Sequence, residues 1–324
     1  KSAQMPLHGW LPGSMEGPTP ISALIHAATM VTAGVYLVCR FSPMFAEMPI
    51  VSEMMALVGA SGALWMGVVG AYQMDIKRVV AYSTLSQLGY MVVALGVGAY
   101  RYAALRLLTH AYFKSLLFLA TGSIKMITHT QDIRKMGGLA KTHPVLMVCY
   151  LCGALALCGV PPFSGFFSKE SILLASEIRL GSQFGSWYVH SAVLLGVGVT
   201  AFYIFRVFWS VFFGVENRVL DPTKSEHKHF WCYGPLLALS VPACVGGVMV
   251  YGAVGEGRFF QGLLASALQG QVLLSKKEAF LSAPSLLWHA IEAPWALGLM
   301  LLAVAASYWL FGRSRKQDAP LVQL

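Results

Sequence analysis

The stretch RLLTHAYFKSLLFLA, residues 106–120, is the most informative part of this chain. It places Arg106, His110 and Lys114 at intervals of four within an otherwise apolar segment. A spacing of four puts all three side chains on one face of a helix. A charge at the centre of a bilayer costs about 2.5–3.5 kcal/mol on insertion scales, so such groups face a protein interior or a water-filled cavity. The stretch therefore predicts a membrane helix with a basic stripe, and its direct interpretation is an ion path, above all for protons.

The composition agrees with a membrane protein. The chain has 324 residues, of which 56% are hydrophobic and 11% charged, and its mean hydropathy is +0.63. A soluble domain carries about 25% charged residues. Membrane barrels alternate polar and apolar residues and do not fit. The net charge of +9 comes from basic residues scattered across loops, which argues against nucleic-acid binding and indicates basic loops on one side of a membrane.

Apolar runs long enough to cross a bilayer recur along the chain. A membrane helix needs about 20 mainly apolar residues. We expect an all-α polytopic membrane protein with about eight spans after an N-terminal stub. Their approximate ranges are 21–40, 51–73, 80–99, 102–122, 144–178, 188–213, 231–252 and 287–311.

The fifth of these segments is expected to be a broken helix. It runs into PPFSGFFSKE, residues 161–170, where Pro161, Pro162 and Gly165 cannot continue a regular helix. The piece after the break is too short and polar to cross alone, so we expect a single crossing. That topology leaves twelve basic loop residues on one side and six on the other, against ten and eight for two crossings. It places the loop 125–142 and the C-terminal tail on the cytoplasmic or matrix side.

Lys169 and Glu170 follow the break directly. Interrupted backbone at membrane depth must line a cavity or be buried in protein, and in transporters it marks the site. Lysine changes its protonation readily when partly desolvated, so Lys169 is a candidate proton carrier. The alternative interpretation of the two residues is an interfacial ion pair near a helix end.

His110 and Lys114 are the strongest candidates for proton carriers, whereas Arg106 stays protonated and sets a field. The alternative is that these side chains hydrogen-bond to helix breaks and only hold the bundle together. His26, in SALIHAATMVTAGVYL (residues 22–37), has hydroxyl neighbours that could extend a hydrogen-bonded path. Its alternative is an ordinary core histidine.

Five further residues could support a path. Lys1 opens the sequence, so its context is missing, and His8 precedes a proline-rich break. Asp75 and Lys77 open the third span, where an aspartate is ordinary chemistry for a helix N-terminus. Arg206, in YIFRVFW, could instead pair structurally or extend toward the interface.

Motifs for nucleotides and metals are missing from the sequence. No G-x-G-x-x-G or P-loop precedes a helix. Cys149 and Cys152 form a C-x-x-C within an apolar run without further ligands nearby, so we interpret the cysteines as core residues and predict no metal site. No set of cysteines matches an iron–sulfur cluster. Energy must therefore come from another chain or from an ion gradient.

Four runs carry a family resemblance: MEGPTPISALIHAATMVTAGVYL, MDIKRVVAYSTLSQLGYM, LTHAYFKSLLFLATGS and QDIRKMGGL. They resemble the antiporter-like subunit 5 family of respiratory complex I (chain L in bacteria), nearly continuously from Lys1 to about residue 214 and weakly beyond. The DIKRxxAYS signature alone is shared with the sister complex I subunits and with Mrp-type cation/proton antiporters. The first, third and fourth runs narrow the choice to subunit 5 or its Mrp counterpart.

The resemblance implies two inverted repeats of five helices, each with one broken helix, and a central axis of charged residues that conducts protons. Arg106 departs from the bacterial pattern, which often has a second histidine there. By motif, the implied path residues are Lys1, His26, His110, Lys114, Lys169 and Glu170. The implied division of the chain is the end of the first repeat (1–20), a linking helix (21–50), the second repeat (51–214) and C-terminal helices with a basic tail (215–324).

The resemblance also implies that this chain is one piece of a split subunit. The family's first six or so helices and its long lateral helix are not in the sequence. We expect a partner chain with the N-terminal half, the neighbouring antiporter-like subunit 4, other membrane-arm subunits and lipids such as cardiolipin. FMN, iron–sulfur clusters and quinone would lie in other subunits, with no redox chemistry in this one. The expected location is the mitochondrial inner membrane, with a bacterial plasma membrane as the alternative.

Three functions are therefore open. The first is a proton-translocating, non-redox subunit of NADH:ubiquinone reductase, and the second is an Mrp-type monovalent cation/proton antiporter subunit. The third is a purely structural piece of the membrane arm, against which the set of His110, Lys114 and Lys169 argues.

Overall fold

The computed structural model describes residues 1–181, 184–215, 230–255 and 282–312, without side chains for 230–232 and 254–255. Within these ranges the regular structure is helical, apart from one isolated bridge between Asp75 and Asp132. The elements are α1 (Trp10–Gly13), η1 (Ser14–Glu16), α2 (Thr19–Ala27), α3 (Ala33–Arg40), α4 (Ser42–Ala46), α5 (Pro49–Tyr72), α6 (Ile76–Gly96), α7 (Tyr100–Thr128), η2 (Ile133–Lys135), α8 (Leu139–Thr142), α9 (Pro144–Cys158), α10 (Ser164–Ile178), α11 (Ser186–Phe208), η3 (Trp209–Phe213), α12 (Phe230–Gly255), α14 (Ala283–Glu292), α15 (Trp295–Ser307) and η8 (Tyr308–Gly312).

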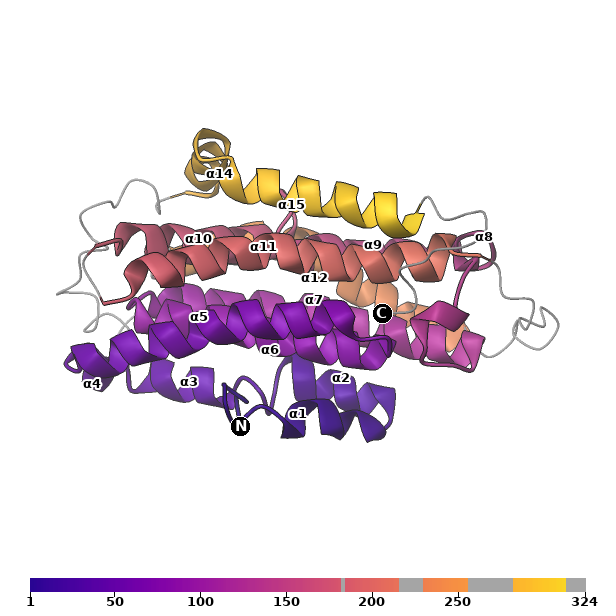
Figure 1. Ribbon diagram of the computed structural model, residues 1–324, viewed down its shortest axis with the longest axis horizontal. Helices are drawn as coiled ribbons and strands as arrows, with labels where there is room; N and C mark the ends of the chain where they lie inside the picture. Colours follow the sequence, from indigo (N-terminus) through magenta and orange to yellow (C-terminus); the bar gives the residue numbers. More distant parts are fainter. Residues whose placement is uncertain (182–183, 216–229, 256–281, 313–324) are drawn as a thin grey trace.

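The long helices run side by side along the longest axis of the molecule (Figure 1). The helices α2 and α3 lie on one face, α14 and α15 on the opposite face, and α7 lies between them. In the described part of the chain, five helices are long and apolar enough to cross a membrane: Pro49–Tyr72, Ile76–Gly96, Ser186–Phe213, Tyr233–Ala253 and Trp295–Gly312. The predicted all-α polytopic membrane class is confirmed. The predicted basic tail, 313–324, lies outside the described residues.

The break predicted in the fifth segment is present between α9 and α10. Gly159 adopts φ +84°, and its amide donates to Ala156 O at 3.2 Å while the amide of Val160 donates to Leu155 O at 3.1 Å. This pair of bonds is a Schellman motif, which needs a left-handed residue and so favours glycine. The two half-helices follow each other along the molecule, with α9 toward the end that carries α8 and α10 toward the end that carries α14 (Figure 1). The pair therefore crosses the bundle once.

The helix expected to be continuous over 21–40 is interrupted instead, between Ala27 and Ala33. Threonine hydroxyls take up carbonyl groups there. Thr32 Oγ1 donates to Ala28 O at 2.7 Å and to Thr29 O at 3.1 Å, and Thr29 Oγ1 donates to Leu24 O at 2.9 Å. Such bonds offer the backbone an alternative to the helical ladder. The chain thus contains another helix break, which the sequence pattern does not reveal. In chain order, the break between α2 and α3 is the first and the break between α9 and α10 is the second.

The helices α5 and α6 pack at close range because glycines line their contact. A Cβ atom at Gly89 would lie 2.4 Å from Ala63 N, and one at Gly96 would lie 2.4 Å from Ala56 N. Facing them, a Cβ atom at Gly59 would lie 2.7 Å from Val93 N. Small residues let the backbones of membrane helices approach in this way.

The last predicted span, 287–311, consists of two helices rather than one. Ser282 and Ser285 form a capping box at the start of α14. Ala293 and Pro294 then separate α14 from α15. A residue before proline is disfavoured in the helical region, and Ala293 adopts φ −114° and ψ 69° accordingly. This bend lets α14 lie against α10 while α15 runs along α11 (Figure 1).

Candidate functional site

The basic stripe of α7 is fully buried. Arg106, His110 and Lys114 have no exposed surface in the structure. Buried charged groups require partners, because an isolated charge in an apolar interior is very costly. The partners of these three side chains come from α2, α6 and α10, so the stripe lies where those helices meet.

Lys114 is bound by α6. Its Nζ donates to Val80 O at 3.1 Å and to the hydroxyl of Ser83. The same carbonyl also accepts from Ser83 Oγ at 2.7 Å and from Thr84 Oγ1 at 3.1 Å. Polar groups of α6 thus surround the ammonium group of Lys114.

His110 is bound to the break between α2 and α3. Its Nδ1 lies 2.9 Å from Ala27 O, the last residue of α2. A carbonyl only accepts, so Nδ1 carries the hydrogen of this bond. The other ring nitrogen, Nε2, is buried and has no partner among the described residues. The neutral ring can therefore accept a proton at Nε2 without breaking its bond to α2.

His26 lies near the end of the same half-helix. Its Nε2 lies 3.0 Å from Ser14 Oγ, whose single hydrogen is donated to Leu11 O at 2.6 Å. Nε2 is therefore the donor to Ser14. The ring is fully buried and stacks on Phe118 at 5.5 Å, and its Nδ1 has no hydrogen-bond partner within the described residues. His26 thus also presents a free acceptor nitrogen to the interior.

Arg106 ties the second break to the bundle. Its Nη1 donates to Gly165 O at 3.0 Å and to Ser168 Oγ at 3.1 Å, both in α10. Its Nη2 donates to the side chain of Gln87 on α6. The guanidinium also lies 5.1 Å from the ring centre of Phe113. Such a network fixes a permanent positive charge beside the break.

Lys169 and Glu170 lie just beyond that break. Lys169 Nζ donates to Cys158 O, the last residue of α9, at 3.2 Å and lies 5.1 Å from the ring centre of Tyr90. The carbonyl end of a helix is its negative pole, so it suits an ammonium group. Glu170 is 6% exposed and its Oε1 lies 3.2 Å from Nδ1 of His289. A small pocket borders both side chains, walled by α9, α10, α11 and α15.

These groups form one electrostatically connected series across the bundle. The charge of Lys114 acts on His26 and His110, that of Arg106 acts on His110 and Lys114, and Arg106 also acts on Lys169. The series runs from α2 on one face, through α7, to α10 near the other face (Figure 1). The structure thus brings together the predicted residues His26, Arg106, His110, Lys114, Lys169 and Glu170.

The other predicted residues lie elsewhere. Lys1 is exposed and His8 is partly buried. Asp75 caps α6 by accepting from the amide of Arg78 at 3.2 Å. Lys77 is buried and donates to Met15 O at 2.7 Å and Gly17 O at 3.0 Å, which ties η1 to α6.

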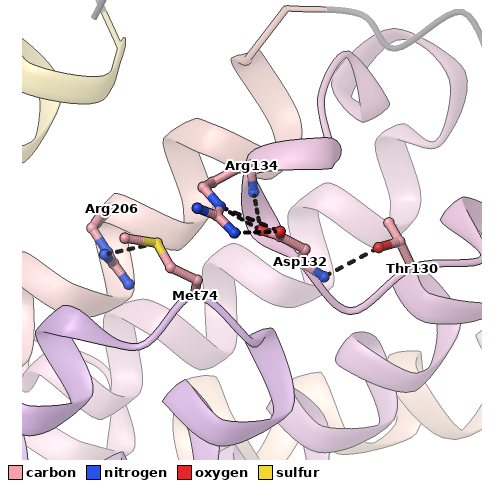
Figure 2. A network of polar contacts seen from close by, with 5 residues as sticks. All are labelled: Met74, Thr130, Asp132, Arg134 and Arg206. Carbon is pink, nitrogen blue, oxygen red and sulfur yellow. Dashed lines mark hydrogen bonds and ion pairs between the residues drawn. The ribbon is translucent and has the colours of Figure 1, made fainter. Parts of the chain in front are cut away.

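Arg206 lies at the end of the molecule where α5 joins α6. Its Nη2 donates to Gln73 O, and its Nη1 lies 4.0 Å from Met74 Sδ (Figure 2). Figure 2 also shows the neighbouring turn, in which Asp132 accepts from Arg134 Nη2 at 2.8 Å. These bonds from Arg134 hold the pKa of the Asp132 carboxyl below its usual range. Arg206 and this turn hold connecting segments in place and do not contact the buried series.

His289 is the residue that sequence reasoning missed. It contacts Glu170, which is 119 positions earlier in the chain. Gln87 was not among the candidate residues either, yet its side chain accepts from Arg106 Nη2. The polarity of α6 signals Gln87, whereas the position of His289 depends on how α14 packs against α10.

Comparison with known proteins points to one family. Residues 1–196 match the family described as "NADH:quinone oxidoreductase/Mrp antiporter, TM". NADH-quinone oxidoreductase subunit L of Neisseria meningitidis serogroup B is 45% identical over 342 residues, which cover 100% of this chain and 50% of the relative. NAD(P)H-quinone oxidoreductase chain 5 of Synechocystis sp. is 50% identical over 224 residues, which cover 66% of this chain and 32% of the relative.

A solved structure agrees with these relatives. The Mrp complex from Dietzia sp. DQ12-45-1b is similar with a TM-score of 0.70 and 25% identity, over 99% of this chain and 35% of the other. The chain spans about half the length of the first curated relatives it matches. The resemblance found in the sequence is confirmed.

Proposed function

Because the chain belongs to the NADH:quinone oxidoreductase/Mrp antiporter membrane family, we propose that it conducts protons as a membrane-arm subunit of an NADH–quinone oxidoreductase. The observation that carries the proposal is the buried series of basic groups that joins the two helix breaks. A stripe of this kind is costly within a membrane protein, and intramembrane ionisable groups are functional by default.

In this mechanism Lys114 and Lys169 alternately hold and release a proton. His110 lies between the first break and Lys114, with Nδ1 held by Ala27 O and Nε2 free to accept. Arg106 is a fixed charge whose field makes simultaneous protonation of both lysines unfavourable, because like charges repel strongly in a low dielectric. Charge changes elsewhere in the assembly would move protons along this series toward Glu170.

The chain itself would have no redox role. Among the described residues no group of three or more His, Cys, Asp or Glu side chains is arranged to hold a metal ion. As the family resemblance implies, FMN, iron–sulfur clusters and quinone would belong to other subunits of the assembly. The partners would be a chain with the N-terminal half of the fold, the neighbouring antiporter-like subunit and lipids such as cardiolipin.

The chain is a multi-pass membrane protein, and its membrane is part of the proposal. The relatives from Neisseria and Synechocystis support a bacterial energy-converting membrane more than the mitochondrial inner membrane expected from the sequence. A monovalent cation/proton antiporter is the second candidate function, because the structure similar over 99% of this chain is an Mrp complex. The two functions differ in whether NADH oxidation drives transport.

The native assembly purified through this chain tests the proposal. Mass spectrometry should identify flavin and iron–sulfur subunits, and the same preparation should reduce quinone with NADH. Recovery with small membrane subunits alone, together with sodium-dependent proton movement in vesicles without NADH, would favour the antiporter and overturn the proposal.

The residue-level test is Lys169→Met in the same assembly. In proteoliposomes we expect a lower ratio of protons moved to electrons transferred. Lys141→Met, on the exposed helix α8, is the matched control and should leave the ratio unchanged. An unchanged ratio in Lys169→Met would remove this lysine from the mechanism.

A further inference from the structure

We propose that His289 carries protons from Glu170 to Glu177, and so connects the buried series to the aqueous surface at the end of the molecule where α10 meets α14. This inference rests on the proposed function, which supplies the proton that arrives at Glu170. It assigns the exit to α14, a helix outside the part of the chain that carries the buried basic stripe.

The geometry places the imidazole between two carboxylates. His289 Nδ1 lies 3.2 Å from Glu170 Oε1, and Nε2 lies 3.9 Å from Glu177 Oε2. One ring nitrogen therefore faces each carboxylate. Glu170 and Glu177 are seven residues apart on α10, which is about two helical turns, so both lie on the face that α14 covers.

Exposure rises along this route. The side chain of Glu170 is 7% exposed, that of His289 is 20% exposed and that of Glu177 is 44% exposed. A structural ion pair would need no such order. A conducting route needs each group to be closer to water than the one before it, and these three side chains satisfy that requirement.

The position of His289 is fixed by the packing of α14. Leu286 and Ala290 are buried at 0% and 2% exposure and lie one helical turn apart, and His289 shares the face of Leu286, three positions before it. On the exposed side of the helix, Trp288 Nε1 donates to Glu292 Oε1 at 2.5 Å. The ring of His289 is therefore held toward α10.

The transfer is balanced in protons. Glu170, protonated on Oε1, gives its proton to Nδ1 of a ring that carries hydrogen on Nε2. The resulting imidazolium releases the Nε2 proton toward Glu177, so one proton enters and one leaves. The gap of 3.9 Å exceeds a hydrogen bond and is spanned by a water molecule or by movement of the half-exposed Glu177 side chain. The neutral ring is left with hydrogen on Nδ1. Rotation of the ring brings Nδ1 to water, and the starting tautomer returns when Nε2 takes one proton from water and Nδ1 gives one to water.

Other charged groups around the ring favour this direction. Lys169, next to Glu170 in the sequence, donates to Cys158 O at 3.2 Å and is the basic group beside that carboxylate. Glu292 on α14 and Glu177 add negative charge beside His289 and support the imidazolium. His190 on α11 lies near Glu177 and hydrogen-bonds to Ser176 Oγ at 3.0 Å.

His289→Asn in the whole assembly distinguishes proton transfer through His289 from a purely structural contact with Glu170. The asparagine amide can keep the bond to Glu170 but does not titrate, so the docking of α14 is preserved. We expect the ratio of protons to electrons to fall at least about twofold at unchanged assembly, and imidazole added to a His289→Ala assembly to restore part of the loss. A wild-type ratio in His289→Asn would overturn the inference, and the role of His289 would be to hold α14 against α10.

Two carboxylate variants provide a matched pair. Glu177→Gln should lower the ratio, whereas Glu47→Gln, exposed at the C-terminal end of α4, should not. Equal ratios in the two variants would contradict the exit route. Lys169→Met is measured in the same series. If Lys169→Met and His289→Asn both keep the wild-type ratio, the proposed function fails. If His289→Asn keeps the wild-type ratio but Lys169→Met lowers it, only the inference about the exit route fails.

Discussion

The two helix breaks end their first half-helix by different chemistry. Each connects its halves with five residues, 28–32 and 159–163. The second uses Gly159 at φ +84° followed by two prolines, whereas the first has neither glycine nor proline and uses the hydroxyls of Thr29 and Thr32.

The breaks nevertheless share one feature. At each, a basic side chain donates to the carbonyl of the last residue of the first half-helix. His110 binds Ala27 O at 2.9 Å, and Lys169 binds Cys158 O at 3.2 Å. The two breaks differ in backbone chemistry but share the contact with a basic side chain. A basic donor at the carbonyl end is therefore their common feature, and glycine and proline are only one way to make such a break.

The largest effect on folding is expected from Gly165→Ala, which disrupts the second break, between α9 and α10. A Cβ atom there would lie 1.7 Å from Ala156 O, so α9 and α10 would have to separate. Overpacking of this kind costs about 1–3 kcal/mol or more, and we expect little folded protein. The amount of assembled chain in membranes measures it. Gly298→Ala is the control, because nothing lies within 4 Å of a Cβ atom there; equal losses in the two variants would contradict the close contact.

His110→Asn tests whether the histidine at the first break conducts protons or only holds the break in place. Asparagine can keep a donor on Ala27 O but cannot accept and release a proton, so α2 stays docked. We expect at least about a tenfold lower rate of proton translocation, in the range typical of lost acid–base groups, with normal assembly. Vesicle acidification driven by NADH measures it. Normal translocation would reduce the role of His110 to holding the break.

Thr32→Val should sharpen the difference between the breaks. It removes the hydroxyl that bonds to Ala28 O and Thr29 O but keeps the shape of the side chain. At about 0.5–1.5 kcal/mol per hydrogen bond, we expect a modestly lower thermal midpoint and faster hydrogen exchange over 25–33. Thr121→Val is the control, since Thr121 Oγ1 is buried without a partner among the described residues. A similar change in both variants would mean that the hydroxyl does not form the break.

The smallest effect is expected far from both breaks, at Asp132→Asn. The pKa of Asp132 is held below its usual value of 3.8 by the bonds from Arg134. That stabilisation is present above the pKa of the unfolded chain and is lost as pH falls through the lower folded value. The variant should therefore melt slightly lower at neutral pH and like the wild type in acid. The pair is largely exposed, so a large change would be inconsistent with its position.

Much of the fold is predictable because it follows from local sequence. Apolar runs define the long helices, and Gly159 with its prolines marks the second break. The first break is not predictable in this way, because threonine is common within helices and its hydroxyl bonds depend on the final backbone. Pro294 could have signalled the bend between α14 and α15.

The candidate site likewise has one part that can be predicted from local sequence and another that cannot. The spacing of Arg106, His110 and Lys114 predicts one buried face, since it depends only on helix geometry. The contact of His289 with Glu170 depends on how α14 packs, which no local pattern contains. Lys77 is the opposite case. Its position in the sequence suggested a role in the path, but its side chain binds the backbone carbonyls of Met15 and Gly17.

The crowded carbonyl of Val80 has a consequence for the speed of the process. It accepts from two hydroxyls as well as from Lys114. When the ammonium group withdraws, the hydroxyls keep the oxygen satisfied, so departure leaves no orphaned acceptor on α6. Lys114 can therefore leave and return by rotation of its own side chain, without waiting for the slower movement of a helix.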